Sequence, residues 1–401
     1  MKNEKHRWIH DPARRAFLRK SFAGMGWMAA GATLSRCTSD EGATTSNIAN
    51  LGPLQGPDEN GLLLPQGFTS RIVARSGMPV GSTDYVWHNA PDGGAVFTTA
   101  DGGYIYVSNS ETAAPLGAGC SAIRFSREGE IVDAYRLLEG TNLNCAGGTT
   151  PWGTWLSCEE TPRGRVHECD PLGVSDAAVR PAMGTFEHEA AAIDEANQHA
   201  YMTEDVEDGR FYRFAYDDPA DLSSGRLEVA EVSDGVEGAV QWEEVPDPEG
   251  DPIETRYQVA SSTVFNGGEG IWFHDGVVYF STKGDNRIWA YETETSVLTI
   301  LYDAATSSTP ILTGVDNLTV SPAGDILVAE DGGDMQIVAI SASGVLVPLV
   351  QVTGQDLSEI TGPAFDPTLQ RLYFSSQRGE EGLDILGRSG ITYEVSGPFF
   401  I

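Results

Sequence analysis

The 401-residue chain has a hydrophobic fraction of 40% and a charged fraction of 21%, a globular composition that excludes a wholly disordered chain. Its 46 glycines and 21 prolines follow no collagen period, so they favour a turn-rich β protein. Residues 1–37 hold eight of the 25 basic residues, and the remainder has 17 basic and 56 acidic side chains, a net charge of −39. A body this acidic argues against binding to nucleic acid or to an anionic membrane surface.

The basic N-terminus is typical of an export signal. Arg14-Arg15 is followed by Phe17-Leu18 and then by an apolar run over residues 23–34, which indicates a twin-arginine (Tat) signal peptide. The alternatives are a membrane anchor or a surface helix, but about 12 apolar residues are too few to span a bilayer, which needs ~20. We therefore predict a signal peptide over 1–37, recognition by the Tat export machinery, no membrane span, and a periplasmic or secreted protein.

The cysteines and a polar segment bound the domain organisation. Cys37 is a candidate lipid anchor, although Arg36 before it is atypical. Residues 38–60 are rich in Ser, Thr, Asn, Gly and acids, which predicts a flexible linker before a single domain over 61–401. The remaining cysteines allow one or two disulfides whose pairing the sequence does not give; they are Cys120, Cys145, Cys158 and Cys169.

One short motif recurs along the body: an aromatic or Leu residue, an apolar residue, a small residue and then polar residues. Its copies begin at Tyr106, Trp155, Tyr201, Tyr279, Leu327 and Tyr373. The intervals are 49, 46, 78, 48 and 46 residues, and a period of this length with short strands is typical of a β-propeller. We predict an all-β, six-bladed β-propeller. The long interval predicts an insertion of about 30 residues in the third blade, which we place at 233–257.

Each repeat opens with a hairpin, because a second short strand precedes each motif and a turn joins the two. In an antiparallel hairpin, the start of the first strand and the end of the second lie at the same edge. The pattern therefore gathers acidic side chains around one axial mouth. The first strands contribute Asp92, Glu189, Glu269 and Asp316, and the second strands contribute Glu111, Glu159, Glu204, Asp205, Asp285, Glu330 and Asp331.

Converging carboxylates repel one another, and bound cations or shared protons relieve that repulsion. Asp is common at strand ends because it makes turns, but Glu has no such role. The recurring Glu residues therefore favour a site for several cations over a solvated acidic rim. Oxygen ligands suit hard cations, above all Ca²⁺.

Two residues near these acids carry other chemistry. Cys158 lies beside Glu159, and a thiolate among carboxylates suits a transition metal such as iron. Half of a disulfide, with Cys145 or Cys169, is an equal alternative. His188 is a candidate ligand or acid–base group, and a hydrogen-bonded channel histidine is the alternative.

The strand ends also carry three cations, Lys283, Arg287 and Arg378. A positive side chain beside metal-binding carboxylates is what an anionic substrate needs. A salt-bridge partner is the alternative role for each of them.

Four segments together form a recognisable pattern: Leu64-Pro65-Gln66-Gly67-Phe68, Trp152-Gly153-Thr154-Trp155-Leu156-Ser157-Cys158-Glu159-Glu160, Phe186-Glu187-His188-Glu189-Ala190-Ala191 and Lys283-Gly284-Asp285-Asn286-Arg287. With the Tat start, they resemble the PhoX-type alkaline phosphatases from about residue 60 to the end. That resemblance implies a six-bladed propeller with an iron pair, Ca²⁺ ions and a cysteine ligand to iron, which cleaves phosphate monoesters.

By this resemblance Cys158 and Glu189 would bind Fe³⁺, and the cluster would be completed by Glu111, Glu159, Asp205 and Asp285. The chain departs from the family pattern at two places. Asn109-Ser110-Glu111 stands where the family has Asn-His-Glu, and Thr282-Lys283-Gly284-Asp285 stands where it has Pro-Arg-Gly-Glu. The phosphate-holding arginine of the family is thus replaced by Lys283.

We predict a monomeric, metal-dependent phosphatase that hydrolyses small phosphate monoesters at an iron and calcium cluster, with Lys283, Arg287 and His188 as catalytic residues. The other acids of the mouth are further candidate metal ligands: Glu204, Glu269, Asp316, Glu330 and Asp331. The alternatives are a Ca²⁺-dependent propeller lactonase or esterase and a non-catalytic, Ca²⁺-stabilised binding propeller. Neither alternative needs a thiolate ligand, so Cys158 separates the phosphatase from both.

Overall fold

The computed structural model describes residues 45–381 and 387–401, and every long element within them is a β-strand. The helical elements of this part are short 3₁₀ turns: η1 (Ile48–Asn50), η2 (Ala114–Leu116), η3 (Pro181–Met183), η4 (Thr255–Tyr257) and η5 (Gly379–Glu381). Among the described residues, no helix is long and apolar enough to cross a membrane. The predicted Tat signal and Cys37 lie outside the described residues.

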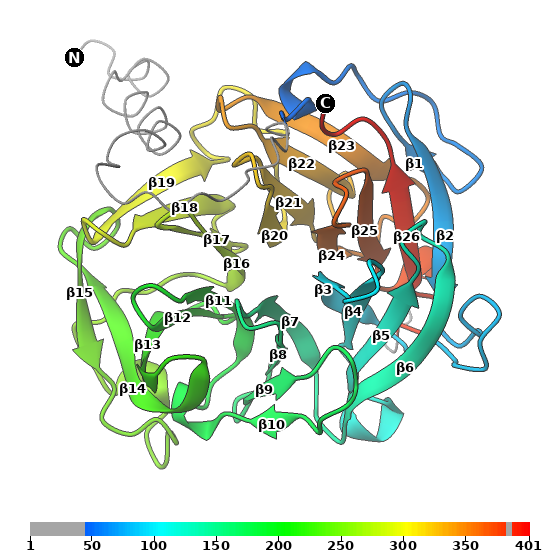
Figure 1. Cartoon of the computed structure of the whole chain (residues 1–401). Coiled ribbons are helices and arrows are strands. Elements are labelled where there is room, and N and C mark those ends of the chain that lie inside the picture. The colour runs from blue at the N-terminus through cyan, green and yellow to red at the C-terminus, as the bar shows by residue number, and fades with distance from the viewer. Residues whose placement is uncertain (1–44, 382–386) are drawn as a thin grey trace, which may run out of the picture.

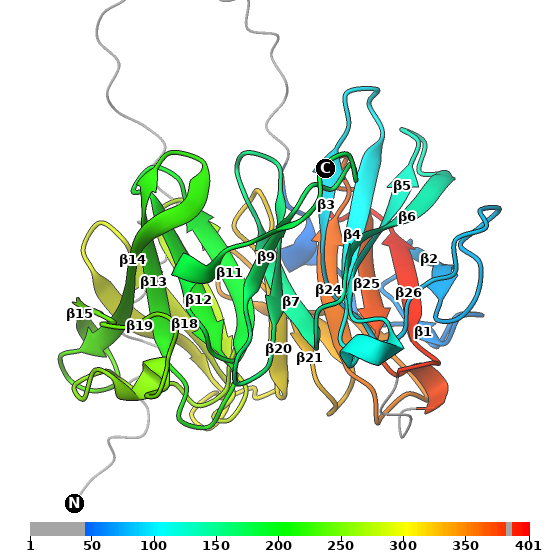
Figure 2. The same cartoon turned by 90° about the horizontal axis from the view of Figure 1, so that it is seen from below.

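The strands form five antiparallel sheets (Figures 1 and 2). One sheet consists of β3 (Pro91–Thr98), β4 (Tyr104–Ser110), β5 (Gly119–Phe125) and β6 (Ile131–Glu139). The next consists of β7 (Asn144–Thr149), β8 (Trp155–Glu159), β9 (Val166–Cys169) and β10 (Ala178–Val179). Two more take a strand from near the start of the described chain. They are β20 (Val315–Val320), β21 (Ile326–Glu330), β22 (Gln336–Ile340), β23 (Leu346–Val352) and β1 (Leu62–Leu63); and β24 (Ile360–Phe365), β25 (Arg371–Ser376), β26 (Ile391–Ser396) and β2 (Thr69–Arg75).

The remaining sheet has nine strands. In spatial order they are β11 (His188–Asp194), β12 (His199–Glu204), β13 (Phe211–Asp218), β14 (Asp221–Val232), β15 (Gly238–Glu244), β19 (Val297–Asp303), β18 (Arg287–Glu292), β17 (Val277–Thr282) and β16 (Gly268–His274). The strand β15 lies in the predicted insertion and pairs with β14 on one side and β19 on the other.

The prediction of an all-β, propeller-like architecture is confirmed, but the prediction of six separate blades is not, since the strands form five sheets. The physical reason is β15. Gly238 and Ala239 at its start pair with Leu298 and Val297 of β19, so the insertion joins two groups of strands into one sheet.

Six strands surround the centre of the molecule: β3, β7, β11, β16, β20 and β24 (Figure 1). Each contacts the next, and β24 contacts β3, so these inner strands form a closed ring. Their backbones lie very close together. A Cβ added at Gly148 of β7 would lie 1.7 Å from the carbonyl oxygen of Ala191 on β11. Only glycine fits there, because a real Cβ contact at that distance does not occur.

The start and end of the described chain lie side by side. Ser46 bridges to Phe400, and β2 pairs with β26, which completes the sheet that also holds β24 and β25. Ile48 is 0% exposed and belongs to the apolar core there. The described part of the predicted linker, residues 45–60, is therefore packed against the domain, since burying Ile48 and pairing Ser46 hold it in place.

Candidate metal centre

Each inner strand is irregular near its start, where its pairing with the second strand skips two residues. The skipped pairs are Asp92-Gly93, Cys145-Ala146, Glu189-Ala190, Glu269-Gly270, Asp316-Asn317 and Gly362-Pro363. A β-bulge of this kind re-aims a side chain out of the regular alternation. In five of the six strands, the first bulged residue is an acid or a cysteine.

A second set of equivalent residues follows the second strand of each hairpin. It consists of Glu111, Glu160, Asp205, Lys283, Asp331 and Gln377. The backbone N–H of each donates a hydrogen bond to a carbonyl oxygen just before the inner strand of its own hairpin. The acceptors are Ala90 (3.0 Å), Leu143 (2.8 Å), Glu187 (3.2 Å), Gly267 (2.8 Å), Gly314 (2.7 Å) and Glu359 (3.0 Å). The same hydrogen bond thus recurs in every repeat and fixes each of these side chains beside a bulge.

Ligand atoms from the two sets come together in four overlapping groups, within each of which they lie within 4.8 Å of one another. The groups are Asp92–Glu111–Cys145, Cys145–Glu160–Glu189, Glu189–Glu269–Asp316 and Asp316–Asp331–Glu359. Because Cys145, Glu189 and Asp316 each belong to two groups, the four are continuous. We call this set of eight carboxyl groups and one thiol the acidic arc.

The donor atoms of the acidic arc fit a bound cation. Glu189 is 0% exposed, and its Oε2 is buried without a hydrogen-bond partner among the described residues. Its Oε1 accepts a hydrogen bond from the Cys145 thiol, with a distance of 3.3 Å between oxygen and sulfur. A buried carboxylate oxygen with no partner is costly unless something positive binds it. Oxygens alone suit Ca²⁺, and a thiolate beside them suits a transition metal.

Burial raises the pKa of carboxyl groups in the acidic arc, and their mutual repulsion adds to the effect. Burial and the charge of Glu111 raise the pKa of Glu160 to about 8. Burial, partly offset by Lys283, raises the pKa of Asp316 to about 6. The pKa is raised well above its ordinary value, through burial first, in Asp92, Glu189, Glu269 and Glu359. A cation would remove this penalty, since an opposite charge favours the ionised form.

The basic side chains of Lys283 and Arg378 contact the acidic arc. Lys283 Nζ lies 2.6 Å from Glu269 Oε1, 3.5 Å from Asp331 Oδ2 and 3.7 Å from Asp205 Oδ2. Burial alone would lower the pKa of Lys283, but these surrounding carboxylates raise it. Arg378 Nη2 lies 3.3 Å from Glu359, at one end of the arc.

The sequence profile of the family described as alkaline phosphatase PhoX matches residues 115–178 and 163–379. The chain belongs to the PhoX alkaline phosphatase family. It is therefore a phosphoric ester hydrolase, and the resemblance seen in the sequence is confirmed.

Solved structures share the fold. Pseudomonas fluorescens PhoX, in complex with the transition-state analogue vanadate, superposes with a TM-score of 0.72 at 17% identity over 88% of this chain and 98% of that chain. A protein of unknown function from Bacteroides thetaiotaomicron gives a TM-score of 0.51 at 9% identity over 86% of this chain and 84% of that chain. No curated protein matches the chain.

Seven acidic residues predicted from the sequence do meet in or beside the acidic arc of this PhoX-family chain: Asp92, Glu111, Glu189, Glu269, Asp316, Asp331 and Asp205. Three others face away from it: Glu159, Glu204 and Glu330. Their carboxylates accept hydrogen bonds from loop backbone N–H groups, those of Asn142 and Arg165 for Glu159, of Arg210 for Glu204, and of Thr313 and Gln336 for Glu330. Side chains alternate along a strand, so the last residue of each second strand points away when the next one points inward.

The structure also keeps Asp285 and Arg287 outside the acidic arc. Arg287 Nη1 is 2.9 Å from Asp285 Oδ2, and Arg287 Nε is 3.2 Å from Asp303 Oδ2. Arg287 therefore forms ion pairs with Asp285 and with Asp303 of β19. Neither the predicted metal ligand nor the predicted catalytic cation is brought to the arc.

The predicted roles of Cys158 and His188 are corrected by the surroundings of the two side chains. Cys158 is 0% exposed in an apolar cluster with Leu156. The His188 ring stacks on Phe186 at a centroid distance of 3.6 Å, and its Nε2 lies 3.2 Å from the carbonyl oxygen of Gly184. Burial lowers the pKa of His188 to about 3, which keeps the ring neutral. Both side chains lie between sheets, not at the axis.

Sequence reasoning missed Cys145, Glu160 and Glu359 as members of the acidic arc. A signal existed for two of them, since Cys145 occupies the repeat position of Glu189, and Glu160 that of Asp331. Glu359 has no such signal. It precedes β24 and is brought to the arc by a bridge between its backbone and that of Asp331. The four cysteines of the described residues are all free thiols, so no disulfide forms among them.

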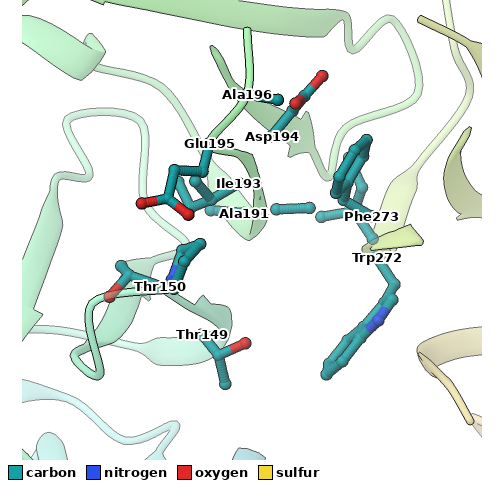
Figure 3. Close-up of a pocket in the computed structure, with 12 residues that line it drawn as sticks. Thr149, Thr150, Ala191, Ile193, Asp194, Glu195, Ala196, Trp272 and Phe273 are labelled. Carbon is teal, nitrogen blue, oxygen red and sulfur yellow. The ribbon is translucent and has the colours of Figure 1, made fainter. Parts of the chain in front are cut away.

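A cavity of about 410 Å³ lies at the other end of β7, β11 and β16 (Figure 3). Its lining includes Thr150, Asp194, Trp272 and Phe273 and no residue of the acidic arc. It is therefore separate from the metal centre.

The raised carboxyl pKa values predict an unusual dependence of stability on pH. Between the ordinary carboxyl pKa of about 4.5 and the value of about 8 reached by Glu160, the folded protein binds more protons than the unfolded chain. The midpoint of thermal unfolding of cation-free protein should therefore fall as pH rises from 5 to 8. Excess Ca²⁺ should flatten or reverse this trend, because ionised carboxylates bind it best. The same pH profile with and without Ca²⁺ would contradict the metal centre.

Proposed function

We propose that this chain hydrolyses phosphate monoesters at a metal cluster held by the acidic arc, in a propeller of six blades. In this count the nine-stranded sheet comprises two blades, β11–β14 and β16–β19, joined by β15. The observation that carries the proposal is the acidic arc itself, with the unpartnered Oε2 of Glu189 inside it, in a member of the PhoX family.

The donor set divides the arc by metal preference. Cys145, Glu160 and Glu189 combine a thiol with two carboxylates, which suits iron. The groups without Cys145 offer only oxygens, which suits Ca²⁺. Bound cations would supply Lewis-acid polarisation of the phosphoryl group. A lactonase or a Ca²⁺-stabilised binding propeller has no use for a thiolate, so Cys145 favours the phosphatase.

The residues of the chain position the arc and meet the substrate charge. Gln377 Nε2 donates hydrogen bonds to Asp92 Oδ2 and Glu111 Oε2, both at 2.5 Å, and so holds two carboxylates in place. Arg378 follows directly, with its side chain 29% exposed at the end of the arc. A guanidinium at this position would hold the negative charge of a phosphoryl group through two parallel hydrogen bonds.

Removing each of two thiols tests the assignment of Cys145. The change Cys145→Ser should lower the iron content and the visible absorption of purified protein, because a hydroxyl is a poorer ligand for that metal. The matched change Cys158→Ser should leave the metal content unchanged and lower stability by about 1–3 kcal/mol, since it buries a hydroxyl among apolar side chains. Elemental analysis and thermal unfolding measure the two effects. Loss of iron from Cys158→Ser but not from Cys145→Ser would restore the sequence-based assignment of Cys158 as the iron ligand.

Replacing Arg378 tests the proposed substrate contact. The change Arg378→Met should lower kcat/KM for a phosphate monoester about 10- to 100-fold, the effect of losing a charged hydrogen bond. It should weaken inhibition by inorganic phosphate similarly. The kcat/KM of Arg378→Lys should lie between those of the parent and of Arg378→Met, because Lys keeps the charge but lacks the planar fork of hydrogen-bond donors. The control is Arg287→Met, which removes an equal charge outside the arc. Unchanged kinetics in Arg378→Met would overturn the role.

We also propose that the chain is exported by the Tat pathway to the periplasm or beyond and acts as a monomer. Support comes from Arg14-Arg15 and the short apolar run after them. The double change Arg14→Lys with Arg15→Lys should keep the protein in the cytoplasm, since the receptor reads the pair and not its charge. Cell fractionation measures this, and normal periplasmic yield would contradict Tat export.

A further inference from the structure

Lys283 breaks the pattern of the residues that follow the second strands. Of the six equivalent positions, four hold acids, one holds Gln377, and only Lys283 is basic. Its backbone N–H donates to Gly267 at 2.8 Å, the hydrogen bond that fixes its counterparts in the other repeats. Its ammonium group is therefore placed where four of the other repeats place a carboxylate.

The ion pairs of Lys283 lie in one half of the acidic arc. Its partners Glu269 and Asp331 each belong to one of the two groups that share Asp316. In the described part of the chain, it forms no ion pair with a member of the two groups that share Cys145. The ammonium group is thus in direct contact with carboxylates around Asp316 and not with those around Cys145, although its charge also acts on Glu111 and Glu160.

We propose that Lys283 is a built-in cation that takes the place of one divalent metal ion in the Glu269–Asp316–Asp331 half of the acidic arc. This inference rests on the metal centre of the proposed function and assigns how its sites are distributed. The ammonium group neutralises carboxylates there without any metal. The oxygen-only groups therefore hold one Ca²⁺ fewer than their carboxylates could bind, and the groups that contain Cys145 keep their metal ions.

Geometry explains why a divalent ion and the Lys283 ammonium group cannot both occupy this half of the arc. A metal ion bound by Glu269 and Asp316 needs carboxylate oxygens of Glu269, one of which already lies 2.6 Å from Lys283 Nζ. A divalent ion at that place would lie within a few ångströms of the ammonium group, and like charges at such distances repel strongly where solvent is largely excluded. Glu269 is 1% exposed, so little water screens the repulsion.

The competing role for Lys283 is direct contact with the phosphoryl group of the substrate. The two roles differ in what the removal of the charge does to metal binding. A built-in cation that is removed leaves a vacant site for a metal ion, whereas a substrate contact that is removed leaves metal binding as it was.

The test compares Lys283→Met, which keeps the aliphatic stem and removes the charge, with Lys283→Arg, which keeps the charge. Arg287→Met is the matched control, since it removes one positive charge outside the arc. Each protein is stripped with chelator, titrated with Ca²⁺ alone in a calorimeter, and analysed for metal after gel filtration. Thermal unfolding is followed in chelator and in excess Ca²⁺. A variant that folds only with Ca²⁺ then still gives an unfolding midpoint in excess Ca²⁺.

We expect Lys283→Met to bind one Ca²⁺ per chain more than the parent, while Lys283→Arg and Arg287→Met match the parent. In chelator, Lys283→Met should unfold at a lower temperature than the parent, and Ca²⁺ should raise its midpoint by more than it raises that of the parent. An unchanged Ca²⁺ count in Lys283→Met overturns the inference. An unchanged count together with weaker inhibition by inorganic phosphate assigns Lys283 to the substrate instead.

Failure of the proposed function has a different signature. It would be a metal-reloaded parent that does not hydrolyse a phosphate monoester, whatever the Ca²⁺ count of the variants. Failure of the inference would be equal Ca²⁺ counts in the parent and Lys283→Met, whatever the activity of the parent.

Discussion

Repulsion among buried carboxylates at the propeller axis is the constraint on which the rest of the structure depends. Eight carboxyl groups and a thiol lie in overlapping groups no wider than 4.8 Å, and several of them are almost fully buried. Such an arrangement costs free energy unless cations share it. The closed ring of inner strands holds these groups together, and the close approach at Gly148 shows how little room the ring leaves for movement.

Two small backbone features turn an ordinary strand pattern into this centre. A bulge near the start of each inner strand turns one side chain toward the axis in five of the six strands, and one hydrogen bond after each second strand fixes another side chain beside it. Because both features recur in every repeat, the chemistry of the centre is decided by which residue occupies each position. Among the positions that do not hold a carboxylate, Cys145 and Lys283 depart in opposite directions, one toward a softer ligand and the other toward a positive charge.

Membership of the PhoX family gives the reaction class, and the acidic arc is the site at which we propose that the reaction takes place. The half of the acidic arc around Cys145 offers mixed sulfur and oxygen donors, and the half around Asp316 is partly neutralised by Lys283. Arg378 contacts Glu359 at one end of the arc, and its neighbour Gln377 holds Asp92 and Glu111 at the other end. The ligand set is thus asymmetric although the repeats that supply it are equivalent.

The sequence by itself determined the all-β repeat, the gathering of acids at one mouth and the family, because hairpin periodicity and local motifs are properties of contiguous residues. Only the tertiary structure decided which of two candidate residues faces the axis: Cys145 on β7 rather than Cys158 on β8, and Glu160 rather than its neighbour Glu159. A bulge shifts the alternation by one residue, and the sequence does not mark it. The joining of two sheets by β15 and the arrival of Glu359 depend on contacts between distant segments, which no local pattern encodes.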